Sequence, residues 1–369
     1  MTSGKRIAVA MSGGVDSTLA AALLIEQGFD VFGLTMDLSS VRRDLYAEPR
    51  EGAGTPPENG ERGKDVEDAA DAARLLNIPH RVVDISREFR KRVIDYFVSE
   101  YRQGRTPNPC IRCNETIKFS LLLETALEGG AEGLATGHYA GIAEHPETRL
   151  RRIKKGRDPD KDQSYFLYRL NQKQLSSVVF PIGGLTKTEV RKQAHHRGLP
   201  AADRDESQEI CFIPGNDYVQ LLRRQIPGAF VPGSIVDENG REIGRHPGIL
   251  HYTIGQRRGL GIAAVHPLYV LEIRPEDNTV VVGENSSLLR KVLTAGDLHL
   301  TFSAAEGDCF EAGARIRYRH QESPASVCIE AGNRASVTFP SPVRAVTPGQ
   351  SVVFYQGDEV LGGGIIQSR

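Results

Sequence analysis

The chain has 369 residues, more than one hydrophobic core usually serves, so its length predicts two or three domains. Hydrophobic residues make up 39% and charged residues 25% of the chain, and both values are ordinary for a folded globular protein. The 46 basic residues nearly balance the 47 acidic ones, which excludes a general attraction to polyanions. Any binding of nucleic acid must therefore come from local patches.

No stretch approaches the roughly 20 consecutive apolar residues that cross a bilayer, and the first residues lack the pattern of a secretory signal. We therefore expect a cytoplasmic protein that contacts no membrane. Five cysteines at irregular spacing do not resemble the disulfide framework of a secreted protein. In a reducing compartment, thiols that lie close together are expected to bind a metal or to do chemistry.

The elements predicted from the N-terminus alternate between strands and helices. Strands are expected at 5–11, 30–38, 80–85 and 133–139, and helices at 17–28, 65–78, 87–103 and 115–128. This alternation predicts a parallel sheet covered by helices on both faces. The segment 43–63 is dense in Gly, Pro and charge and has no apolar period, so we interpret it as a mobile surface insertion.

After about residue 217 the pattern changes to short alternating runs broken by Gly and Pro, which predicts an all-β region with a break near 282–290. Cys309 and Cys328 fall in this region. We expect both to be free, buried cysteines that pack as small apolar side chains.

The segment "MSGGVDS" (11–17) follows a predicted strand and opens a predicted helix, which is where backbone N–H groups and the helix dipole bind phosphate. It matches neither G-x-x-x-x-G-K-[ST] nor G-x-G-x-x-G, and it lacks the lysine of the former. It resembles the PP-loop of ATP pyrophosphatases, which transfer AMP to an oxygen of the substrate. Its glycines admit the phosphates, and Asp16 is expected to hold Mg²⁺. The alternative is a turn without a ligand.

Cys110 and Cys113 share the loop "TPNPCIRCNE", and the next helix is expected to begin near Asn114. The helix dipole and the charge of Arg112 would favour their thiolates. Cys211 lies about a hundred residues away, so a meeting of the three thiols would depend on tertiary structure. A second C-x-x-C is missing from the sequence, which leaves structural zinc with a histidine ligand as a less favoured alternative.

Seven motifs together carry a resemblance: "MSGGVDS", "GRTPNPCIRCNETIKF", "ATGHY", "KDQSYFLY", "ICFI", "HPGILHYTIGQRRGLGI" and "AVTPGQSVVFY". In this order they resemble the bacterial tRNA 2-thiouridylases over nearly the whole chain, the 43–63 segment excepted. The resemblance implies a Rossmann-like α/β PP-loop catalytic domain (1–216), a central tRNA-binding domain (217–284) and a C-terminal β-barrel (285–369). It implies ATP-dependent 2-thiolation of the wobble uridine, in which O2 is adenylated and a cysteine persulfide delivers sulfur to C2.

The same resemblance assigns residues to the site. The residues expected at ATP and Mg²⁺ are Ala10, Met11, Ser12, Gly13, Gly14, Val15, Asp16, Ser17, Met36 and Gly137. Those expected at tRNA are Asn108, Pro109, Cys110, His138, Lys161, Asp162, Gln163, Arg317, Tyr318 and Gln350. Cys211 would carry the persulfide and Cys113 would be its partner nucleophile. The expected partners of this monomer are the anticodon arm of tRNA and a persulfide donor, either a cysteine desulfurase or a relay protein.

Two features leave alternatives open. Some family members have an acid in place of Cys110, and three thiols would suit a [4Fe–4S] cluster with one iron open to sulfide, held by Cys110, Cys113 and Cys211. The basic run 149–157 would either contact phosphates or form a solvated hairpin. Rival functions are a PP-loop synthetase or amidotransferase for a small molecule, and a non-catalytic RNA-binding protein with structural zinc.

Overall fold

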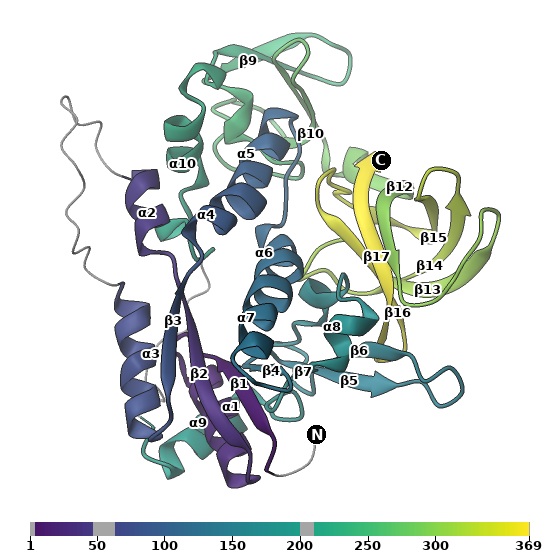
Figure 1. Cartoon of the computed structure of the whole chain (residues 1–369). Helices are drawn as coiled ribbons and strands as arrows, with labels where there is room; N and C mark the ends of the chain where they lie inside the picture. The colour runs from purple at the N-terminus through teal and green to yellow at the C-terminus, as the bar shows by residue number, and fades with distance from the viewer. Residues whose placement is uncertain (1–3, 47–62, 200–209, 369) are drawn as a thin grey trace, which may run out of the picture. The chain divides into compact units, whose positions relative to one another are not determined.

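A computed structural model describes residues 4–46, 63–199 and 210–368 of the chain (Figure 1). Most of the predicted mobile insertion lies outside these residues, and its first part belongs to a helix, α2 (Ser39–Tyr46). The chain divides into two compact units. Unit 1 comprises Met1–Val93, Cys110–Pro214 and Asp358–Val360, and unit 2 comprises Ile94–Pro109, Gly215–Gly357 and Leu361–Arg369.

A parallel five-stranded sheet forms the centre of unit 1, in the order β3-β2-β1-β4-β7. Its strands are β1 (Arg6–Ala10), β2 (Asp30–Asp37), β3 (His80–Asp84), β4 (Leu134–Thr136) and β7 (Val178–Val179). The chain adds β2 and β3 on one side of β1 and then returns to place β4 on the other side. Open α/β sheets bind ligands at such a reversal, beyond the carboxyl ends of the strands. The loops after β1 and β4 are therefore the expected walls of a site.

The helix α1 (Val15–Glu26) packs against α3 (Lys64–Leu75) and α9 (Lys187–His196). Eight of its twelve residues are buried, and its run of alanines lets neighbouring elements approach closely. Leu19 and Ala20 pack with Val190 of α9, while Ala21 and Leu24 pack with the alanines of α3. This burial holds the first turn of α1 firmly behind the glycine loop.

The two longest helical segments of the N-terminal half each contain a π-helical stretch. The first consists of α4 (Ser86–Phe89), η1 (Arg90–Ile94) and α5 (Asp95–Arg102), and the second of α6 (Pro109–Cys113), η2 (Asn114–Leu122) and α7 (Leu123–Glu128). The second segment begins at Pro109, five residues before the predicted start, because the fixed φ of proline suits the first helical position. The remaining elements of unit 1 include α8 (Gln172–Ser176) and the hairpin of β5 (Ala140–Glu144) and β6 (Arg151–Lys155).

Unit 2 contains a four-stranded sheet and a six-stranded barrel. The sheet has the order β10-β11-β8-β9, with β8 (Gly233–Val236), β9 (Glu242–His246), β10 (Tyr269–Arg274) and β11 (Thr279–Gly283). One helix, α10 (Tyr218–Gln225), interrupts the region predicted to be all β, and Tyr218 stacks on Tyr101 of α5 with ring centroids 5.1 Å apart. Among the helices that the structure describes, none is long and apolar enough to span a bilayer.

The barrel is formed by β12 (Leu289–Leu300), β13 (Cys309–Arg315), β14 (Ser323–Glu330), β15 (Arg334–Arg344), β16 (Ser351–Gln356) and β17 (Glu359–Ser368). Its strand order is β12-β15-β14-β13-β16-β17, and pairing of β12 with β17 closes it. Apolar side chains such as Val327, Val337 and Phe354 fill the interior. Closure leaves no open edge between the first and last strands of the barrel.

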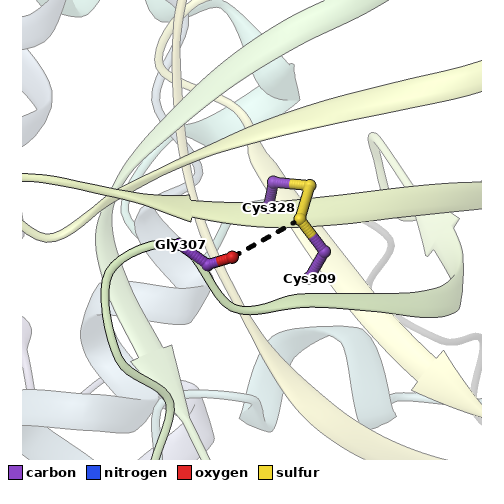
Figure 2. Close-up of a disulfide and its surroundings, with 3 residues drawn as sticks. All are labelled: Gly307, Cys309 and Cys328. Atoms are coloured by element: carbon purple, nitrogen blue, oxygen red, sulfur yellow. Dashed lines mark hydrogen bonds between the residues drawn. A yellow bond between two sulfur atoms is a disulfide. The ribbon is translucent and has the colours of Figure 1, made fainter.

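The prediction for Cys309 and Cys328 was wrong, because the two residues form a disulfide (Figure 2). The antiparallel register of β13 and β14 sets them directly opposite one another, with Cα atoms 4.1 Å apart. Cys309 is exposed and Cys328 is half-buried, so neither packs as a core residue. The Cys309 sulfur also lies 3.8 Å from the carbonyl oxygen of Gly307. The pairing depends on strand register, which the spacing of two cysteines does not reveal.

Candidate functional site

The glycine loop connects β1 to α1 and curls over the start of the helix. Gly13 has φ +73°, and a Cβ there would lie 2.5 Å from Cβ of Asp68, so only glycine fits. The Ser17 hydroxyl donates to the carbonyl of Gly14 at 3.1 Å and accepts from the backbone N–H of Ser12 at 3.2 Å. Because the first N–H groups of a helix have no partner within it, the loop can bind an anion such as phosphate.

The loop after β4 forms the opposite wall. A Cβ on Gly137 would lie 2.7 Å from the backbone of Asp16 and of Ser17, so the absence of a side chain lets the two loops touch. The next residue, His138, is 8% exposed, and its Nδ1 lies 2.7 Å from the Thr136 hydroxyl. Burial, assisted by a nearby ammonium, lowers the pKa of His138 well below its usual value. His138 is therefore neutral at physiological pH.

The carboxylate of Asp16, expected to hold Mg²⁺, has two partners in this structure. The Lys187 ammonium donates to both carboxylate oxygens, at 2.8 and 2.9 Å. The Tyr139 hydroxyl donates to one of them at 2.7 Å. Met36, which is also expected at the nucleotide, lies half-buried near the end of β2, the strand next to β1. The predicted nucleotide residues thus gather at the carboxyl ends of three neighbouring strands, β1, β2 and β4.

The three free cysteines all lie in unit 1 and interact electrostatically with one another. Cys113 is 8% exposed, and burial raises the pKa of its thiol to about 12. Cys110 and Cys211 keep part of their surface in solvent, yet the surrounding protein displaces enough water to raise the pKa of both thiols. The prediction of favoured thiolates was therefore wrong for this state of the protein. The meeting of the three cysteines is a tertiary feature.

Lys118 is the cation that these thiols share. Its ammonium lowers the pKa of Cys110, Cys113 and Cys211, against the larger effect of desolvation. The sequence had pointed to Arg112 instead, but that guanidinium forms an ion pair with Glu115 at 2.9 Å. Lys118 lies five residues after Cys113 within the π-helical stretch, where each turn is closed by an i to i+5 hydrogen bond. Lys118 belongs to the motif "GRTPNPCIRCNETIKF", but the π-helical geometry of this stretch was not predicted.

The helix α2 holds the Cys211 segment in place. Arg42 donates from Nε to the carbonyl of Cys211 at 3.1 Å, and the Tyr46 hydroxyl donates to the carbonyl of Phe212 at 3.0 Å. Phe212 is 1% exposed and meets the Phe89 ring edge to face. A buried aromatic anchor beside Cys211 fixes the backbone, while the cysteine itself stays accessible.

Within residues 4–46, 63–199 and 210–368, no set of three or more His, Cys, Asp or Glu side chains is arranged to hold a metal ion. The cluster alternative for Cys110, Cys113 and Cys211 therefore gains no support from the described residues, although the three thiols lie close enough to affect one another's pKa.

Several residues expected at tRNA organise the loops of unit 1. Asp162 is 3% exposed, and its carboxylate accepts from the backbone N–H groups of Gly156 and Ser164 at 3.0 and 3.1 Å. The Gln163 side chain accepts from the N–H of Tyr139 at 2.9 Å. Lys161 is half-buried beside them. These contacts brace the loop that follows β4.

The other residues expected at tRNA lie in unit 2, Cys110 and His138 excepted. Gln350 donates from its side chain to the carbonyl of Thr106 at 2.8 Å, two residues before Asn108, and Pro109 is buried. Arg317 donates to the carbonyl of Arg344 at 3.0 Å, and Tyr318 is the next residue in the chain. The 348–350 turn thus fixes the backbone that leads to Asn108.

The arginines of the basic run 149–157 are paired with acids. Arg149 and Arg151 lie near Glu144, at 2.7 and 3.8 Å. Arg152 pairs with Glu359 at 3.2 Å and Arg157 with Glu189 at 3.0 Å. These ion pairs favour the interpretation of the run as a hairpin with neutralised charge.

Comparison with known proteins matches three family models in chain order. The tRNA methyl transferase HUP domain matches residues 5–215, the tRNA methyl transferase PRC-barrel domain 220–284, and the aminomethyltransferase beta-barrel domain 290–366. The predicted fold class is confirmed by these matches. The chain is 49% identical over 364 residues to the tRNA-specific 2-thiouridylase MnmA of Geobacter metallireducens, covering 99% of this chain and 97% of that one.

Two other relatives give the same result. The tRNA-specific 2-thiouridylase MnmA of Pelobacter propionicus is 48% identical, covering 98% of this chain and 97% of its own. That of Carboxydothermus hydrogenoformans is 45% identical, covering 99% and 98%. Identity of this extent argues against both rival functions, a small-molecule synthetase and a non-catalytic RNA-binding protein. The chain therefore belongs to the tRNA-specific 2-thiouridylase family, and it is an ATP-using sulfurtransferase that thiolates tRNA.

Proposed function

We propose that unit 1 adenylates O2 of the wobble uridine at the glycine loop and that Cys211 and Cys113 then replace this oxygen with sulfur. One observation carries the proposal: a short series of neighbouring residues connects the glycine loop to the three cysteine thiols. Gly137 touches the loop, His138 follows Gly137 in the chain, and the charge of Lys118 acts on both His138 and the three cysteines. ATP chemistry and sulfur chemistry would thus share one site.

In the first step, O2 of uracil attacks the α-phosphorus of ATP. Pyrophosphate leaves with the electron pair of the broken bond, and the N3 proton passes to solvent. In the second step, the terminal sulfur of a persulfide on Cys211 attacks C2, and AMP leaves with the original oxygen. Cys113 then attacks Sγ of Cys211, which forms a Cys113–Cys211 disulfide and releases the thiouridine, whose N3 regains a proton. A thiol reductant must supply two electrons to restore both cysteines.

The high pKa of Cys113 suits its proposed place in this sequence. A thiol with a pKa of about 12 keeps its proton at neutral pH, and the thiolate is the reactive form. Cys113 would therefore stay inert until the substrate is in place and a base removes its proton. Cys110 is proposed to contact the flipped base beside Asn108 and Pro109. The alternative of sulfide bound to a [4Fe–4S] cluster gains no support from the arrangement of the three thiols.

We also propose the finer features implied by the resemblance. They are the ATP-Mg²⁺ site, the tRNA contacts, a protein persulfide donor, a cytoplasmic location and a monomer bound to the anticodon arm. The boundaries 1–216, 217–284 and 285–369 are supported by the family models at 5–215, 220–284 and 290–366. Asp162 would act by shaping its loop, because its carboxylate is buried.

A single-turnover assay tests the sulfur transfer. Enzyme preloaded with persulfide is mixed with tRNA and ATP-Mg²⁺ in iron-free buffer, and AMP and 2-thiouridine are measured by mass spectrometry. The wild type should form both in equal amounts. Cys211→Ser should form adenylated tRNA but no thiouridine. Cys113→Ser should release about one AMP per enzyme and leave tRNA attached to Cys211 through a reducible disulfide.

The matched control is Cys309→Ser/Cys328→Ser, since it removes the disulfide of unit 2, whose cysteines lie outside the proposed site. Full thiolation by Cys113→Ser would contradict its assigned role. Activity that disappears when iron is removed, and returns when iron and sulfide are restored, would favour the cluster route instead.

A further inference from the structure

The glycine loop lacks the lysine by which P-loops bind phosphate, and the structure brings a lysine to it from another part of the chain. Lys187 lies 171 residues after Asp16, yet its ammonium is 2.8 Å from the Asp16 carboxylate. The Lys187 side chain is 10% exposed. A lysine is rarely so buried unless it is paired, and here the partner belongs to the loop itself.

The backbone around Lys187 is held rigidly. Lys187 is the first residue of α9, whose capping box is formed by Thr186 and Glu189. The Lys187 N–H also donates to the carboxylate of Asp158 at 2.8 Å. The side chain then passes the face of Tyr139, with Nζ 5.7 Å from the ring centroid. The ammonium is therefore anchored at its base and reaches the loop on a flexible stem.

Fold stability alone is a weak reason for this ion pair, because the cost of removing two charges from water often exceeds their attraction. The neighbourhood of the pair suggests another reason. Asp16 lies in the first turn of α1, where backbone N–H groups attract an anion. A side chain at position 137 would clash with the backbone of Asp16 and Ser17, so the loop after β4 lies directly against the glycine loop. A compact ammonium at that position can exchange a carboxylate oxygen for a phosphate oxygen with little movement.

We propose that Lys187 is the phosphate-binding lysine of this enzyme and contacts the β- and γ-phosphates of ATP. This inference rests on the proposed adenylation at the glycine loop. When O2 attacks the α-phosphorus, the bond to the bridging oxygen breaks and negative charge develops on pyrophosphate. The ammonium stabilises that charge as it forms. Asp16 keeps its bond from Tyr139 and gains an oxygen that is free to bind the cation accompanying ATP.

Equilibrium binding of ATP and of AMP, without tRNA or a sulfur donor, tests the proposal. Lys187→Met should weaken ATP binding about ten- to a hundredfold, since one charge-assisted contact is lost. AMP lacks the β- and γ-phosphates, so its affinity should change less than about threefold. Lys187→Arg should restore part of the ATP affinity. The matched control is Lys192→Met, an exposed lysine of the same helix, which should change neither affinity.

If Lys187→Met left the ratio of ATP to AMP affinity unchanged, the proposal would be overturned. A purely structural role predicts that result, because it would weaken the binding of both nucleotides equally. If Lys187→Met does not fold, Asp16→Asn/Lys187→Met removes both charges and is compared with Asp16→Asn alone. The double variant should bind ATP about tenfold more weakly than Asp16→Asn, with AMP affinity equal. A wild type that binds ATP but forms no thiouridine would contradict the proposed function and leave this ratio unaffected.

Discussion

Gly137 lies so close to Ser17 that a Cβ on the glycine would be 2.7 Å from the Ser17 backbone nitrogen. Gly137→Ala should therefore push the glycine loop away and slow ATP-dependent AMP formation by tenfold or more, with a stability cost of about 1–3 kcal/mol. The matched control is Gly184→Ala, because no atom lies within 4 Å of its new Cβ. Equal AMP formation by both variants would show that the loops do not need this contact.

The parts of the molecule predicted from sequence are those encoded locally. The strand before the glycine loop and the Ala-rich helix behind it were expected at 5–11 and 17–28 and are observed at Arg6–Ala10 and Val15–Glu26. Their apolar patterns and the glycines between them act over a few residues, so one sequence is enough to read them. The short alternating runs after residue 217 similarly predicted the β-rich region.

The features that were missed depend on tertiary contacts. Lys187 reaches Asp16 across 171 residues, and nothing in its own neighbourhood of the sequence marks it as part of the ATP site. The ammonium of Lys118 was overlooked for a different reason, since the adjacent Arg112 seemed the nearer cation until its pairing with Glu115 was known. Some unpredicted helices did carry a local signal. In α2 it is the apolar pair Val41 and Leu45 at helical spacing, and in α9 it is the capping box of Thr186 and Glu189.

The Cys309–Cys328 disulfide should stabilise the barrel without contributing to catalysis. It closes a loop across 19 residues, so loss of the bond in Cys309→Ser/Cys328→Ser should lower the free energy of unfolding by about 3 kcal/mol. Denaturant titration with and without reductant measures the effect on the wild type, and titration of free thiols should find three per chain. Five free thiols in protein purified without reductant would contradict the bond.

Neutral His138 should make the fold sensitive to acid. Burial lowers its pKa in the folded protein, so the unfolded chain binds the proton more tightly. The contribution of His138 to stability is therefore present above the unfolded pKa of about 6.5 and is lost as the pH falls below it. Relative to His138→Gln, the wild type should lose up to about 2 kcal/mol of unfolding free energy between pH 7 and pH 5. Denaturant titration at both values would detect the difference, and parallel losses in the two proteins would refute it.

Lys118 should control the reactivity of the thiols while leaving ATP binding intact. Its ammonium opposes the desolvation that raises the pKa of Cys113, so Lys118→Met should raise that pKa further and reduce the thiolate present at a given pH. Alkylation of Cys113 at pH 8 should slow by about three- to tenfold, and its pH profile should move to higher pH. Lys118→Arg retains the charge and should recover most of the rate.

The exposed Lys173 provides the control, because Lys173→Met removes a charge without touching the thiols. Since adenylation precedes sulfur transfer, AMP bound to tRNA should accumulate in Lys118→Met. A variant that loses adenylation and alkylation together would instead indicate a collapsed site.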